Sequence, residues 1–156
     1  ASGHSCGLNI LSGDYVERIH GVTAPEAVGY AMHEGVRAPL YASSSGKLFL
    51  AHMKSRDVES YLDRVELRPI TRRSVGSISE LRRQIKLARE EGVAYSKDEF
   101  TNGIVGFSVP VLNARSRMAA SLGLVIPTGE FDAKRNSLTL KLRATARLIS
   151  AQISSR

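Results

Sequence analysis

The chain has 156 residues, 42% of them hydrophobic, which suits one domain with a single core. No run approaches the roughly 18 apolar residues that cross a bilayer, and no charged-then-apolar signal-peptide pattern is present, so we expect a cytoplasmic protein without membrane contact. The formal net charge of +7 is spread over scattered residues and short pairs, with no aromatic residues between those pairs, which disfavours a single-strand nucleic-acid platform.

Two strands and an unassigned stretch are predicted at the start of the chain. Residues 8–11 and 15–20 flank Ser12-Gly13, which indicates two strands around a tight turn. Residues 21–35 combine glycine and proline with side chains of mixed character. A short strand and a mobile loop are one interpretation of that stretch.

Two helices are predicted next. Ser43 or Ser44 is a favoured N-cap, and the segment from Leu48 to Ala51, with Met53, is apolar almost all round. That pattern predicts a buried helix rather than an amphipathic surface helix. A second, short helix is predicted over residues 56–64.

Capping and periodicity predict two further helices. Ser77 and Glu80 fit a capping box, in which the Ser77 hydroxyl accepts from the Glu80 N–H and the Glu80 carboxylate reaches back. The helix that they open ends at Gly92, and the last helix is predicted over residues 132–154. The two apolar stripes are Ile78, Leu81, Ile85 and Ala88, and Leu138, Leu142, Thr145, Ile149 and Ile153.

Residues 104–126 predict a β-hairpin with two unlike faces. If the turn centres on Ala114-Arg115, Leu112 faces Arg117 and the register of the strands follows. The bulky, core-facing pairs are Val105/Leu124, Phe107/Leu122, Val109/Ala120 and Val111/Met118, and the opposite face has Ile104/Val125, Gly106/Gly123, Ser108/Ser121 and Pro110/Ala119. Paired glycines on that second face would leave a hollow for a ligand, or would let a helix pack closely.

The turn before the buried helix has three interpretations. Ser44 and Lys47 have the Ser-x-x-Lys spacing that lets an amine serve a nucleophilic serine as base, although the companion motifs are absent. The same helix N-terminus presents unpaired N–H groups and a partial positive charge, and Gly46 lets the backbone come close, which suits a carboxylate or phosphate. Ordinary capping without a ligand is the third interpretation.

Other chemistry has little support in the sequence. The four histidines have no metal-ligand spacing, and Cys6, the one cysteine, excludes an internal disulfide and indicates a reducing compartment. We therefore expect neither a metal nor a cofactor. Asp98-Glu99 has the composition of a solvated loop, and nothing else supports a glycosidase-like acid/base pair.

The segment PLYASSSGKLFLA, residues 39–51, resembles the signature of the effector-binding domain of IclR-family transcriptional regulators. Further matching landmarks follow in the same order as in the family, and the resemblance covers essentially the whole chain. They are Thr71 ahead of the Ser77 capping helix, Leu81 through REEGVAY at 89–95, Asp98-Glu99 before Gly103, the strand with Val109-Pro110-Val111, and the long last helix.

The resemblance implies an α/β (α+β), GAF-like fold, with an antiparallel sheet of about six strands flanked by helices in a single domain over residues 1–156. It implies a sensor of small organic acids and not an enzyme. The ligand would modulate DNA binding by an N-terminal winged helix-turn-helix domain within a homodimer or homotetramer. That domain is absent here, and because the chain starts at Ala1 without Met we expect a fragment. A free-standing small-molecule-binding module and a Ser-x-x-Lys acyl hydrolase are the alternatives.

The resemblance also implies a ligand-binding set that combines backbone amides of the serine turn, an acidic loop residue, an apolar wall and the hairpin face. The amides are those of Ser44 and Ser45, and the acidic residue is Asp98, with Glu99 as the alternative. Tyr30 and Ala38 form the apolar wall, and Gly106, Gly123 and Val125 lie on the hairpin face. Members that bind small keto acids tend to have Cys or Ser at the three hairpin positions, and the loop between Tyr95 and Gly103 looks about two residues short. The loss of polar groups and volume favours an aromatic or otherwise bulky acid.

Overall fold

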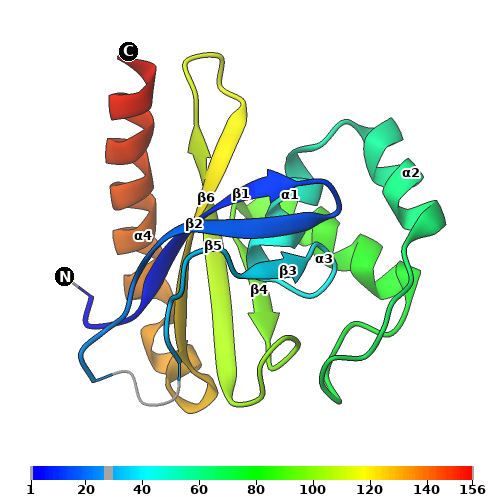
Figure 1. The fold of residues 1–156 in the computed structure, drawn as a ribbon, viewed down its shortest axis with the longest axis horizontal. Coiled ribbons are helices and arrows are strands. Elements are labelled where there is room, and N and C mark those ends of the chain that lie inside the picture. Colours follow the sequence, from blue (N-terminus) through cyan, green and yellow to red (C-terminus); the bar gives the residue numbers. More distant parts are fainter. Residues whose placement is uncertain (1, 27–29, 156) are drawn as a thin grey trace.

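The computed structural model describes residues 2–26 and 30–155 (Figure 1). Six strands form one antiparallel sheet in the order β3-β2-β1-β6-β5-β4. The strands are β1 (Cys6–Ser12), β2 (Tyr15–Val22), β3 (Arg37–Pro39), β4 (Ala94–Lys97), β5 (Ile104–Leu112) and β6 (Met118–Pro127). Residues 27–29, within the stretch that the sequence left unassigned, lie outside the described residues.

In the described part of the chain, four α-helices and one short 3-10 helix accompany the sheet. They are α1 (Ser44–His52), α2 (Ser55–Arg64), α3 (Ile78–Glu91), η1 (Thr128–Glu130) and α4 (Phe131–Ser154). No helix of the described residues is long and apolar enough to cross a membrane. The GAF-like expectation of about six antiparallel strands flanked by helices is confirmed.

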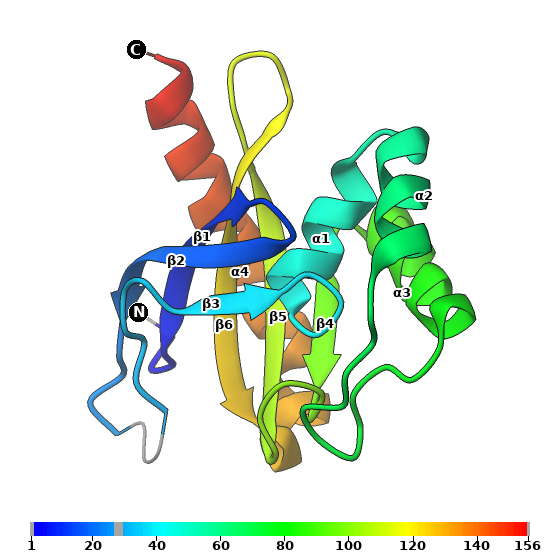
Figure 2. The same cartoon turned by 45° about the vertical axis from the view of Figure 1, so that its right-hand side comes forward.

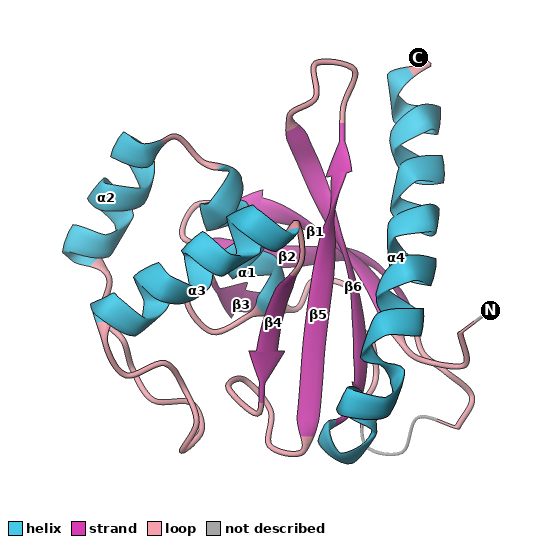
Figure 3. Cartoon of the chain, turned by 180° about the vertical axis from the view of Figure 1, so that it is seen from behind, coloured by secondary structure: helices cyan, strands magenta, loops and turns pink. Residues whose placement is uncertain are grey.

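The sheet is curled, so that β1–β3 run across the direction of β5 and β6 (Figures 1 and 2). Helix α4 packs on β5 and β6 from one face, whereas α1 contacts β1, β2, β4, β5 and β6 from the other. Figure 3 shows the same division from behind, with α4 on one side of the sheet and α1 and α3 on the other. Because α1 touches strands from both halves of the sheet, it lies inside the curl.

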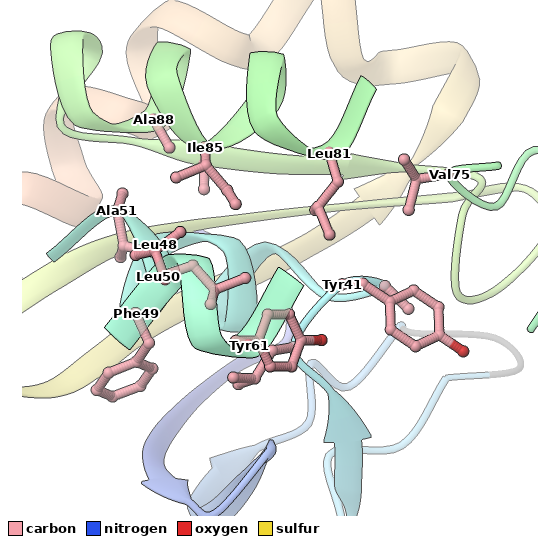
Figure 4. Close-up of a cluster of buried hydrophobic side chains, with 14 of the residues drawn as sticks. Tyr41, Leu48, Phe49, Leu50, Ala51, Tyr61, Val75, Leu81, Ile85 and Ala88 are labelled. Carbon is pink, nitrogen blue, oxygen red and sulfur yellow. The ribbon is translucent and has the colours of Figure 1, made fainter. Parts of the chain in front are cut away.

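Helix α1 is buried all round, as its apolar sequence predicts. Every residue from Ser44 to Ala51 is buried. Leu81, Ile85 and Ala88 of α3 point at α1 and close it off from solvent (Figure 4). A second apolar cluster fills the space between the sheet and α4, and it includes Val105, Phe107, Val109, Val111, Leu122, Leu124, Ile126, Phe131, Leu138, Leu142 and Ala146.

The predicted caps hold with one correction. Ser43 caps α1, and the Ser77 hydroxyl accepts from the Glu80 N–H at 3.2 Å. The Glu80 carboxylate does not reach back, because it binds Arg83 and Gln84 instead. Gly92 ends α3 with a left-handed φ of 66°.

The apolar stripe of α4 also departs from prediction. Leu138 and Leu142 are buried as expected, and Ala146 continues the stripe, whereas Thr145 is exposed and Ile153 is 42% exposed. Thr139 is buried as well, so the buried face of α4 is centred between Leu138 and Thr139. At about 100° per residue, Leu142 and Ala146 fall on that face and Thr145 falls outside it.

The β5–β6 hairpin has the predicted faces in a different register. Phe107 pairs with Leu124, two residues from its predicted partner, because residues 113–117 form the turn and the register shifts between Val111 and Leu112. A shift of two residues leaves every side chain on its face, so the bulky face is core as predicted. The glycines are not paired with each other, since Gly106 faces Val125 and Gly123 faces Ser108.

Candidate functional site

A cleft lies inside the curl, between the N-terminus of α1, strands β1–β3 and the β5–β6 hairpin. The space between its walls, including the part open to solvent, is about 630 Å³. The walls are mostly apolar, with polar groups gathered near α1. The lining residues are Gly7, Asn9, Val16, Arg18, Tyr30, Met32, Val36, Ala38, Ser43, Ser44, Ser45, Ser96, Phe100, Thr101, Ile104, Gly106, Ser108, Gly123, Leu124 and Val125.

Most of the ligand-binding residues that the resemblance implies lie around this cleft. Seven of them line it, namely Ser44, Ser45, Tyr30, Ala38, Gly106, Gly123 and Val125, and Asp98 does not. The lining residues come from segments that are far apart in the chain, so only the fold brings them together. Their role in holding a ligand stays a prediction.

The first turn of α1 presents two unused donors to the cleft. The Ser43 hydroxyl accepts from the Gly46 N–H at 3.0 Å, which satisfies one of the free amides of the helix start. In the described part of the chain, the N–H groups of Ser44 and Ser45 have no acceptor. Together with the positive end of the helix dipole, they form an anion-binding arrangement.

The hydroxyls of Ser44 and Ser45 are not caps, which corrects the sequence interpretation. Both bond the Ser108 hydroxyl of β5, at 2.8 and 3.0 Å. Ser45 also accepts from Ser121 of β6 at 2.8 Å and from the Asn9 side chain of β1 at 3.1 Å. These five side chains join α1 to three strands through one buried network. Sequence reasoning had Ser108 and Ser121 on the correct face but assigned neither them nor Asn9 a function.

Gly106 and Gly123 leave space for the serine hydroxyls of this network rather than for a ligand. A Cβ at Gly123 would lie 2.9 Å from the Ser108 hydroxyl oxygen, and one at Gly106 would lie 3.3 Å from that of Ser44. The missing side chains therefore make room for serine hydroxyls. Gly46 was predicted to let the backbone approach a ligand, and it instead lies against the backbone of Leu40.

Asp98 is satisfied within its own loop, which corrects its predicted place in the pocket. It has a left-handed φ of 57°, and its carboxylate accepts from the Gly103 N–H at 2.7 Å and the Thr128 hydroxyl at 2.8 Å. The tight turn leaves the carboxylate facing its own loop and η1. Phe100 and Thr101 of this loop reach the cleft instead.

Glu99 also points away from the cleft and forms a buried ion pair with Lys47. The Lys47 side chain is 1% exposed, and its amine donates to the Glu99 carboxylate and, at 3.2 Å, to the Tyr95 carbonyl. Burial lowers the pKa of Lys47 and raises that of Glu99, while the pairing opposes both shifts. Because the Ser44 hydroxyl bonds Ser108 and the amine bonds these two partners, the Ser-x-x-Lys pair of an acyl enzyme is not formed.

One charged residue of the cleft was not predicted from the sequence. Arg18 of β2 lines the cleft and is the one charged side chain among its described lining residues. Its position in a predicted strand gave no signal of function. The described residues contain no group of three or more histidine, cysteine or acidic side chains that could hold a metal ion.

Comparison with known proteins gives the family. The family model described as "Bacterial transcriptional regulator IclR C-terminal" matches residues 1–151. The regulator KdgR of Dickeya chrysanthemi is 29% identical over 147 residues, which are 94% of this chain and 48% of that protein. The chain spans about a third to a half of the length of the first curated relatives that it matches.

Solved structures agree with the fold. The C-terminal domain of Escherichia coli KdgR superposes with a TM-score of 0.86 at 27% identity, over 97% of this chain and 88% of that one. The inducer-binding domain of PobR from Acinetobacter, in complex with 3-hydroxybenzoic acid, has a TM-score of 0.85 at 22% identity, over 94% and 87% of the two chains. The chain belongs to the IclR family and corresponds to the C-terminal domain of its regulators.

Proposed function

We propose that this domain binds a small organic acid with an aromatic or otherwise bulky apolar body. The bound acid would modulate DNA binding by a winged helix-turn-helix domain outside this chain, within a cytoplasmic homodimer or homotetramer. The observation that carries the proposal is the pair of unused N–H donors at Ser44 and Ser45, at the polar end of a mostly apolar cleft. A carboxylate fits the donors, and an apolar body fits the remaining walls.

The anion-binding role of the α1 amides can be tested at Ser44, the first residue of the helix. Proline is favoured at this position and removes the N–H, and Ser43 has the extended φ and ψ of −106° and 149° that proline requires before it. Because a hydrogen bond to a charged group contributes about 1.5–3 kcal/mol, Ser44→Pro is expected to weaken acid binding by about 10- to 100-fold in isothermal titration calorimetry.

Ser44→Ala is the matched control for that experiment. It removes the hydroxyl that bonds Ser108 and keeps the N–H, so it should bind the acid with nearly unchanged affinity and show a slightly lower melting temperature. Equal affinities of the two variants would show that the amide does not hold the ligand.

The size and polarity of the ligand can be tested by thermal shift. Benzoate and its hydroxylated forms are expected to raise the melting temperature, because the carboxylate suits the α1 amides and the ring suits the mostly apolar walls. Benzamide, which has the same shape without the charge, should have little effect. Stabilisation by pyruvate or glyoxylate with no response to aromatic acids would contradict the bulky-ligand proposal.

A further inference from the structure

The side chain of Arg18 lies flat on the floor of the cleft, over strand β1. Arg18 pairs with Asn9 across the β1–β2 ladder, and a Cβ at the nearby Gly7 would lie 2.8 Å from its Nε and 3.2 Å from its Cδ. A glycine inside a strand often marks such a close approach. The absence of a side chain at position 7 therefore makes room for the arginine to lie along the sheet.

The guanidinium of Arg18 has no partner among the residues that the structure describes. Its Nε is buried without a hydrogen-bond acceptor, and no carboxylate within residues 2–26 and 30–155 forms a salt bridge with it. No aspartate or glutamate is found among the described residues that line the cleft. A buried donor without an acceptor costs free energy, more so on a charged group. A ligand with a negatively charged group would remove that cost.

Arg18 and the α1 amides lie over different strands of the cleft floor. Arg18 lies over Gly7 of β1, and Gly7 pairs with Gly123 of β6. The Ser45 hydroxyl lies over Gly123, and the Ser44 hydroxyl lies over Gly106 on the next strand, β5. One to two strand spacings, roughly 5–10 Å, therefore separate β1, beneath Arg18, from the strands beneath the two serines. The two groups of donors lie at neighbouring positions along the cleft floor, and each can take a carboxylate of its own.

We propose that the natural ligand is a dicarboxylate, with one carboxylate on the Ser44 and Ser45 amides and the other on the Arg18 guanidinium. The guanidinium offers a planar pair of donors that matches a carboxylate. The apolar walls cover the carbon body between the two groups. This inference rests on the proposed function and narrows its ligand class from acids in general to diacids.

The experiment compares diacids with the monoacids of the same carbon body by isothermal titration calorimetry. The pairs are succinate with butyrate, adipate with hexanoate, and isophthalate with benzoate. We expect the native domain to bind the best diacid at least tenfold more tightly than its monoacid. Arg18→Met should abolish that preference and leave the affinity for the monoacid unchanged.

Two further variants separate the charge of Arg18 from its position. Gly7→Ala retains the guanidinium but displaces it from the floor, so it should also lose the preference for the diacid. Arg37→Met removes an exposed cation on the neighbouring strand β3 that does not line the cleft, and it should keep the preference. Because Arg18 has no partner to lose within residues 2–26 and 30–155, Arg18→Met should melt no lower than the native domain.

The outcomes separate this inference from the function on which it rests. Monoacids that bind as tightly as their diacids would overturn the dicarboxylate proposal and leave acid binding intact. A loss of the same factor for both acids in Arg18→Met would also overturn it, because the guanidinium would then share the carboxylate held by α1. If neither class of acid binds, both proposals fail together.

Discussion

Replacing Glu99 with alanine is expected to lower the free energy of unfolding by about 3–5 kcal/mol, because it leaves the Lys47 ammonium buried without its counter-charge. The Tyr95 carbonyl remains as a hydrogen-bond partner but supplies no charge. Urea denaturation at neutral pH would measure the change. The double variant Lys47→Met/Glu99→Leu should recover most of the loss, since two apolar side chains of similar size need no compensation. If Glu99→Ala alone lowered the free energy of unfolding by less than about 1 kcal/mol, Glu99 would not be the group that compensates the buried charge of Lys47.

The pH dependence of Lys47→Met gives a second measurement on the same pair. Burial raises the pKa of Glu99 while Lys47 opposes the rise, so removing the amine raises that pKa further. A carboxyl whose pKa is higher in the folded than in the unfolded protein binds extra protons on folding, and stability then increases as the pH falls through the folded value. The stability lost in Lys47→Met should therefore be smaller at pH 5 than at pH 8.

Gly46→Ala is expected to destabilise the domain by about 3 kcal/mol, although alanine is normally the better helix former. A Cβ at Gly46 would lie 2.4 Å from the Cα and the carbonyl oxygen of Leu40, which are backbone atoms that cannot rotate away. The chain before α1 and the helix itself would have to separate. Differential scanning calorimetry would measure the drop in melting temperature.

The control for Gly46→Ala is Gly129→Ala. A Cβ at Gly129 would meet no atom within 4 Å, and the residue has no positive φ, so its substitution should change stability by less than about 0.5 kcal/mol. A stable Gly46→Ala domain would show that the contact between α1 and Leu40 is loose.

Local signals in the sequence located most of the elements. Helix α1 was predicted from its capping serine and its apolar sequence, and α3 from Ser77 and Gly92, because caps and periodicity act within a few residues. The strand pair β1–β2 was predicted from its glycine turn in the same way. Strand β3 has three residues and β4 has four, which is too short for periodicity to show.

The register of the β5–β6 hairpin and the composition of the cleft depend on contacts between residues that are far apart in the sequence, so local patterns could not predict them. The five-residue turn after Leu112 is closed by the Asn113 side chain, which accepts from the N–H groups of Arg115 and Arg117. The shorter turn expected there changed the partner of Leu112 by one residue, and the irregularity between Val111 and Leu112 changed the partners of the residues before it by two. The place of Asp98 was predicted through resemblance alone, and its left-handed backbone turned it away from the cleft. The place of Arg18 in the cleft could not be predicted, because it depends on the space that Gly7 leaves on the adjacent strand.

The start of the loop that follows β4 is fixed to two other segments of the chain. The Lys47–Glu99 pair fixes it to α1, and the hydroxyls of Thr71 and Ser74 donate to its backbone carbonyls at Asp98 and Glu99. The wall formed by Phe100 and Thr101 is therefore ordered when the domain folds, so a ligand does not have to order it on binding.

The opposite wall, with Tyr30, Met32 and Val36, comes from the connection between β2 and β3, outside any helix or strand. Connections of this kind accept substitutions more readily than buried elements do. Under the proposed function, substitutions at Tyr30, Met32 and Val36 would change the ligand that the cleft prefers and leave the buried ion pair and the serine network intact.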